Sequence, residues 1–115
     1  MISHVVLMKP RADLSDVDRA AFVDAFERAV RDIPTVRDVS VARRLRHGAG
    51  YEHTAPDVAF VATISFDDLA GLQTYLGHPA HQELGERFGR AMQLALVYDC
   101  EVGELGDLRR WQSLP

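Results

Sequence analysis

The chain has 115 residues and a formal net charge of −4, with 47% hydrophobic and 26% charged residues, which is the composition of one ordinary globular domain. Its densest basic cluster is Arg43, Arg44 and Arg46, too small to neutralise many phosphates, so we expect no nucleic-acid partner. Because Cys100 is the only cysteine and no apolar run approaches membrane-spanning length, we expect no intrachain disulfide, no cysteine-based zinc site, no membrane contact and a cytoplasmic location.

The first third of the chain predicts a strand followed by a helix. Residues 4–9 form a short apolar run rich in β-branched side chains, which is typical of a strand. Apolar residues then recur at helical spacing and predict a helix over 16–32, capped by Ser15 or Asp16 and ended by Pro34.

The rest of the chain predicts three more strands and a second, interrupted helix. Residues 36–46 and 58–66 read as strands, separated by a polar, Gly- and Pro-containing loop at 47–57. A helix capped by Asp67 or Asp68 follows, is interrupted by Pro79 and continues as a second helical piece. A last strand is predicted at 94–102.

This β-α-β-β-α-β order predicts an α+β, ferredoxin-like fold, with an antiparallel four-stranded sheet and the helices on one face. We assign residues 1–103 to this domain and 104–115 to a C-terminal tail. The tail contains Trp111 and is available to cover a sheet edge or to reach another subunit.

The predicted sheet is apolar on both faces. In the first strand, Val6 and Met8 lie on one side and Val5 and Leu7 on the other. Helices cover only one face, and a bare apolar face exceeds what a soluble monomer usually exposes. We therefore expect a homodimer whose sheets pack face to face around a barrel-like interior.

Residues 75–82, with the sequence YLGHPAHQ, carry the most specific motif. Together with a histidine in the first strand (His4) and the segments HVVLMK and TISF, this motif resembles the stress-responsive A/B barrel (Dabb, dimeric α/β-barrel) family. The likeness spans roughly residues 2–102 and implies the ferredoxin-like fold and the dimer.

The resemblance implies several activities. Some plant members are implicated in stress tolerance or form larger rings, and others are cofactor-free polyketide cyclases that close a ring by aldol condensation. In those cyclases the Tyr and the last His of the motif are the catalytic pair, which corresponds to Tyr75 and His81 here. The cyclases carry a polar ring residue on the third strand, where this chain has Phe60, so a more apolar pocket is implied.

The residues themselves favour the same pair. Pro79 suits the first position of a new helix and forces His78 into an extended conformation, so His78 is expected at the N-cap. His81 shares a helical stripe with Leu84 and faces inward, where burial and the helix N-terminus favour the neutral ring of a general base. Tyr75, one turn before the proline, can donate a hydrogen bond to an oxyanion or orient His81.

A structural interpretation stands beside each of these residues, because buried histidines and tyrosines often only satisfy backbone groups or pack. If the site is functional, we expect Tyr75 and His81 to be catalytic and His4, His78, Phe60 and Val6 to bind the ligand. We expect no metal, because no ordered carboxylate or thiolate spacing joins the histidines.

Three functions follow as alternatives. The first is a homodimer that binds a small, partly apolar carbonyl compound in a cavity lined by Tyr and His, with or without cofactor-free, cyclase-like acid–base catalysis. The second is a non-catalytic, stress-associated oligomer. The third is a monooxygenase of the dimeric α/β-barrel type, which rests on analogy of fold alone.

Overall fold

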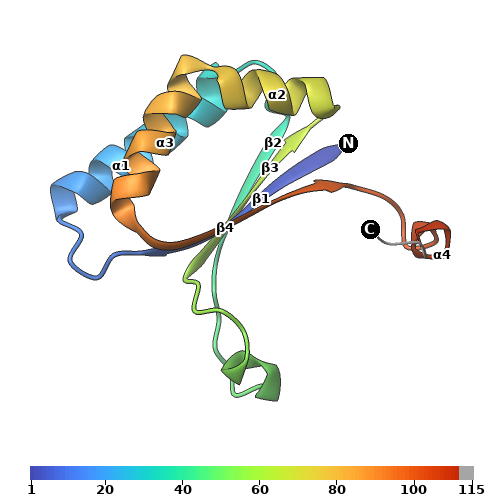
Figure 1. The fold of residues 1–115 in the computed structure, drawn as a ribbon, viewed down its shortest axis with the longest axis horizontal. Coiled ribbons are helices and arrows are strands. Elements are labelled where there is room, and N and C mark those ends of the chain that lie inside the picture. The colour runs from blue at the N-terminus through green and yellow to red at the C-terminus, as the bar shows by residue number, and fades with distance from the viewer. Residues whose placement is uncertain (112–115) are drawn as a thin grey trace.

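The structure is a computed structural model that describes residues 1–111. Four antiparallel strands form one sheet in the order β2-β3-β1-β4, and helices α1, α2 and α3 lie on one side of it (Figure 1). The α+β, ferredoxin-like fold predicted from the sequence is therefore confirmed. In chain order the elements are β1 (Ile2–Pro10), α1 (Asp16–Asp32), β2 (Asp38–Arg43), the 3-10 helix η1 (Gly50–His53), β3 (Phe60–Phe66), α2 (Leu69–Gly77), α3 (Pro79–Ala91), β4 (Met92–Glu101) and α4 (Asp107–Arg110).

Short polar side chains begin two of these helices. The Ser15 hydroxyl accepts a hydrogen bond from the backbone N–H of Asp18 at 3.1 Å, and α1 then occupies the predicted range. The Asp68 carboxylate accepts from the backbone N–H of Gly71 at 2.8 Å and begins α2. Each cap supplies an acceptor for an N–H that has no partner within its helix.

His78 separates α2 from α3. Its backbone is extended, with φ −74° and ψ 142°, because the Pro79 ring disfavours helical backbone in the preceding residue. The His78 N–H still donates to the Tyr75 carbonyl at 3.2 Å and closes α2, while Pro79 occupies the first turn of α3. The corner predicted from the sequence is confirmed.

The core lies between the helices and one face of the sheet. On β3, alternate residues Ala62, Ile64 and Phe66 are buried against the helices, as the two-residue period of a strand requires. The helices contribute small and large buried residues to the same layer, namely Ala25, Ala29, Leu72, Tyr75, Leu84 and Ala91.

The opposite face of the sheet has no α-helix over it within residues 1–111 (Figure 1), and only the 3-10 helix η1 borders it near Leu7 and Val61. Register places apolar residues of three strands side by side there, with Leu7 between Val61 and Leu96. Val5 lies opposite Tyr98, which is 56% exposed. This helix-free face is thus apolar at its centre, as the sequence indicated.

Several element boundaries differ from the predicted ones, since β1 is longer at both ends and β3 begins two residues later. β2 is confined to Asp38–Arg43, and the loop predicted at 47–57 contains η1. β4 begins at Met92, directly after α3, because the chain passes from helix to extended backbone at that residue without a loop.

The predicted tail is described only in part. Gly103 packs against the Trp111 ring so closely that a Cβ there would lie 2.5 Å from a ring carbon. α4 lies beyond the end of β4, away from the other helices (Figure 1). Residues 112–115 lie outside the described residues, and the domain boundary near residue 103 stays a prediction. Within residues 1–111, no helix is both long and apolar enough to cross a membrane.

Candidate functional site

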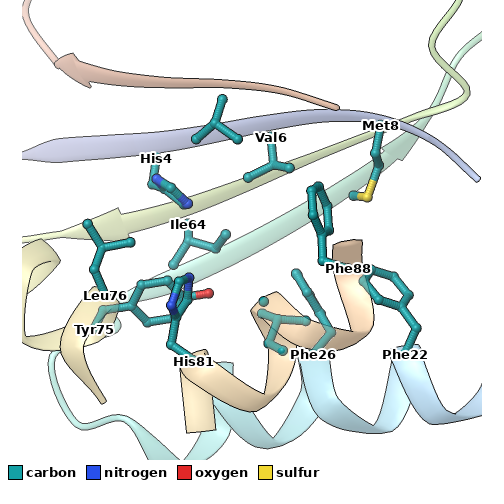
Figure 2. Close-up of a pocket in the computed structure, with 13 residues that line it drawn as sticks. His4, Val6, Met8, Phe22, Phe26, Ile64, Tyr75, Leu76, His81 and Phe88 are labelled. Atoms are coloured by element: carbon teal, nitrogen blue, oxygen red, sulfur yellow. The ribbon is translucent and has the colours of Figure 1, made fainter. Parts of the chain in front are cut away.

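A cavity of about 230 Å³ lies between the sheet and the helices (Figure 2). Three polar rings, His4, Tyr75 and His81, gather at one end of it. The remaining lining is apolar apart from one glycine, and consists of Val6, Met8, Phe22, Phe26, Ile64, Leu76, Leu84, Gly85, Phe88 and Val97.

Tyr75 and His81 are in contact across the α2–α3 corner. Their ring centroids are 4.7 Å apart with an interplanar angle of 59°. Tyr75 is only 1% exposed and also packs on Phe66, with centroids 5.2 Å apart. In Figure 2 its hydroxyl oxygen points into the cavity beside the His81 ring.

His4 reaches the same end of the cavity from the sheet. Its ring is 5.9 Å from the Tyr75 ring in an edge-on arrangement. His4 lies directly opposite Asp99 in the β1–β4 register, and His4 Nδ1 is 2.5 Å from a carboxylate oxygen of Asp99. Since a carboxylate only accepts hydrogen bonds, this contact assigns the proton to Nδ1 and leaves Nε2 for other partners.

Burial shifts the pKa values of Tyr75 and His81 in opposite directions. Removal from water raises the pKa of the Tyr75 hydroxyl to about 12. Burial, and then the nearby His4, lower the pKa of His81 below its usual 6.5, and these causes outweigh the opposing hydrogen bond to the Leu76 backbone. Near neutral pH the cavity therefore holds a protonated phenol beside a neutral imidazole.

The structure brings four of the six predicted site residues together. Tyr75, His81, His4 and Val6 all line the cavity. His78 does not, and its ring instead accepts a hydrogen bond from the Ala80 N–H at 3.0 Å as the α3 cap. Phe60 does not line the cavity either.

The position of Phe60 along β3 explains this difference. Phe60 is on the helix-facing side of β3, but at its first residue, paired with Met8 and Arg43. It is 38% exposed there. Ile64, four residues further on, is the β3 residue that reaches the cavity.

Several residues in or beside the cavity were not expected there from the sequence. Asp99 was not among the predicted site residues, although the antiparallel register of β1 and β4 places it opposite His4, which it binds. Phe22 and Phe26 of α1, which belong to the apolar helical pattern over 16–32, form part of the cavity wall. Their helical spacing could place them inward but could not show that space remained beside them.

The polar end does not resemble a metal site. Imidazole and carboxylate are common metal ligands, and His4, Asp99 and His81 are the relevant groups here. Among residues 1–111, however, no group of three or more His, Cys, Asp or Glu side chains is arranged to hold an ion.

Comparisons with known proteins agree with this architecture. The family described as the stress responsive A/B barrel domain matches residues 2–102. Olivetolic acid cyclase from Cannabis sativa is 22% identical over 102 residues, which cover 85% of this chain and 93% of that protein.

Two solved structures show the same fold. Hydroxynitrile lyase from Passiflora edulis superposes with a TM-score of 0.76 at 16% identity, covering 90% of this chain and 94% of that one. A dimeric protein of ferredoxin-like fold from Bacteroides fragilis superposes with a TM-score of 0.61 at 21% identity, covering 88% and 95%.

The geometry of His78 gives a stability prediction. His78→Ala removes the acceptor of the Ala80 N–H and should lower the free energy of unfolding by about 1 kcal/mol, as loss of an N-cap usually does. His78→Asn supplies a cap of another kind and should recover most of that loss. Urea denaturation measures both variants, and an asparagine variant no more stable than the alanine variant would contradict the capping role.

Proposed function

We propose that this chain, which belongs to the stress-responsive A/B barrel (Dabb) family, is a cofactor-free enzyme. Its substrate is a small, partly apolar carbonyl compound. His81 is the general base and Tyr75 the hydrogen-bond donor to the carbonyl oxygen. His4, held by Asp99, and Val6 shape the binding site around the reacting group.

The observation that carries this proposal is the contact of Tyr75 with His81 inside an otherwise apolar cavity. The ring centroids of His81 and the buried Tyr75 are 4.7 Å apart, so both side chains can contact the same small substrate. Their shifted pKa values support the division of roles, because a neutral imidazole accepts a proton and a phenol with a pKa of about 12 keeps its own.

The chemistry at these two groups is proton transfer next to a carbonyl. A nitrogen of His81 takes a proton from the carbon α to the carbonyl, and the electron pair moves to the carbonyl oxygen. The Tyr75 hydroxyl donates a hydrogen bond to the resulting enolate, whose charge is costly in an apolar cavity without such a donor. The enolate then takes the proton back from His81, or it attacks a second carbonyl carbon, whose oxygen takes that proton from His81.

Cavity size and lining favour a small substrate with an apolar part. The cavity of about 230 Å³ is smaller than the 300–1,000 Å³ usual for drug-sized ligands. Phe22, Phe26 and Phe88 provide aromatic surface away from the polar end (Figure 2). The names of the two related enzymes, a cyclase and a lyase, are compatible with acid–base chemistry of this kind.

Exchange of α-protons tests the proposal without knowledge of the natural substrate. In D₂O the protein should accelerate deuterium incorporation next to the carbonyl of 4-phenyl-2-butanone, measured by NMR. His81→Gln should remove this acceleration, and Tyr75→Phe should reduce it by roughly a hundredfold, the usual effect of losing one oxyanion donor.

Two matched variants control for unspecific effects. His53→Gln and Tyr51→Phe make the same chemical changes at exposed positions away from the cavity and should exchange like the wild type. If exchange with the wild-type protein stays at the buffer rate, or if His81→Gln exchanges normally, the acid–base proposal is wrong.

The pH dependence of this exchange follows from the direction of the His81 shift. Only the neutral ring accepts a proton, so exchange per enzyme at low ketone concentration should rise with pH through a pKa below 6.5. It should then stay level through neutral pH, because Tyr75 loses its proton only near pH 12. Rates measured between about pH 4 and about pH 9 cover the rise, and a midpoint above 6.5 would contradict the assignment of His81.

The helix-free face supports the further proposal that the protein is a homodimer. No α-helix of residues 1–111 covers the apolar residues that lie together there, namely Val5, Leu7, Val61 and Leu96. A second copy related by a two-fold axis would cover this face with the same apolar surface. A related ferredoxin-like structure is described as dimeric.

Light scattering after size exclusion tests the dimer. We expect a particle of twice the 12.8 kDa chain mass. Leu96→Arg, on the helix-free face, should shift it toward monomer because an unpaired charge would be buried, whereas Leu69→Arg, exposed on α2, should not. A wild-type monomer, or a larger ring, would contradict the proposed dimer.

A further inference from the structure

Gly85 is the one cavity-lining residue without a side chain. A glycine at this position does not stabilise helix α3, which carries it. Gly85 lies in the middle of α3, where glycine is less favourable than alanine because it loses more backbone freedom on folding. Its φ is not positive, since Gly48 alone has a positive φ among the described glycines. A Cβ built at Gly85 would meet nothing within 4 Å. Neither backbone conformation nor close packing therefore requires a glycine here.

The position of Gly85 in the cavity offers another reason. The cavity is open to solvent where its lining is exposed, and three lining residues are exposed: Leu76 at the end of α2, Gly85 on α3 and Val97 on β4. Gly85 follows His81 by one helical turn and precedes Phe88 by three residues, so it lies between the proposed base and an aromatic wall. The bare backbone of α3 thus borders the cavity mouth.

We propose that Gly85 sets the width of the substrate, and that the substrate carries a flat ring next to its carbonyl-bearing chain. This inference rests on the proposed function and names the substrate class. A ring lying against α3 needs the space that a Cβ would take, whereas a slim alkyl chain can pass beside a methyl group. Phe22, Phe26 and Phe88 supply the aromatic surfaces against which such a ring packs with favourable geometry.

Two ketones of different width and one matched variant test this inference. The binding of 4-phenyl-2-butanone and of 2-heptanone is measured by ligand-observed NMR, which requires no turnover. Gly85→Ala should weaken binding of the phenyl ketone by roughly tenfold, the cost of a modest steric clash, and change binding of 2-heptanone by less than about twofold. Gly89→Ala is the control, because Gly89 is exposed on the same helix, has nothing within 4 Å of its Cβ and does not line the cavity.

Thermal unfolding separates this role from a structural one. Both alanine variants should raise the melting temperature by about 2–6 °C through improved helix propensity. A lower melting temperature for Gly85→Ala would show that the fold needs the glycine and would overturn the inference. Equal effects of the two substitutions on binding, equal loss of both ketones, or unchanged binding of the phenyl ketone would also overturn it.

Failure of this inference is distinguishable from failure of the proposed function. Binding of the phenyl ketone that is sensitive to Gly85→Ala, without α-proton exchange, would support the width limit and contradict the acid–base chemistry. Exchange that is unaffected by Gly85→Ala, with unchanged binding, would do the reverse. If the wild-type protein binds neither ketone, both are contradicted.

Discussion

The proline at position 79 is the constraint on which the candidate site depends. Tyr75 and His81 are six residues apart, and in a continuous α-helix such residues point about 120° away from each other. Pro79 forces His78 out of the helical region, ends α2 and restarts the chain as α3 in a new direction. Only with this break do the two rings reach a centroid separation of 4.7 Å. His78 contributes by capping both helices at the corner.

Burial then gives the two rings different properties. Removal from water disfavours the charged form of each group. It therefore raises the pKa of the Tyr75 phenol and lowers the pKa of the His81 imidazole. One apolar cavity thereby produces a donor that keeps its proton and a base that is free to accept one. His4 adds a third ring from the sheet, oriented by Asp99 rather than by the corner, so the polar end draws on both layers of the fold.

Much of this architecture was predictable because it follows from local rules. Helical periodicity with a serine cap gave the bounds of α1, and the proline gave the corner and the roles of His78 and Pro79 in it. The inward direction of His81 followed from its stripe with Leu84. The family motif indicated the fold and the pair of Tyr75 and His81, but it gave no distance between the two rings.

The parts that were missed depend on long-range geometry. Phe60 was expected in the site and does lie on the helix-facing side of β3, but its distance along the strand from the cavity is set by the register with β1. Asp99 joins His4 only through the β1–β4 register, which links residues 95 positions apart. The open space beside Phe22, Phe26 and Gly85 depends on how completely α1 and α3 fill the volume above the sheet, and no local pattern encodes that.

The proposed chemistry requires His81 to be a neutral base held in an apolar cavity. NMR titration of the five histidine rings in the ¹⁵N-labelled protein, with the His81 signals assigned by their absence in His81→Gln, measures this directly. We predict a His81 pKa below 6.5, so that the ring is neutral at physiological pH. A His81 pKa above 6.5, which would leave a larger fraction of the ring charged at neutral pH, would contradict this role.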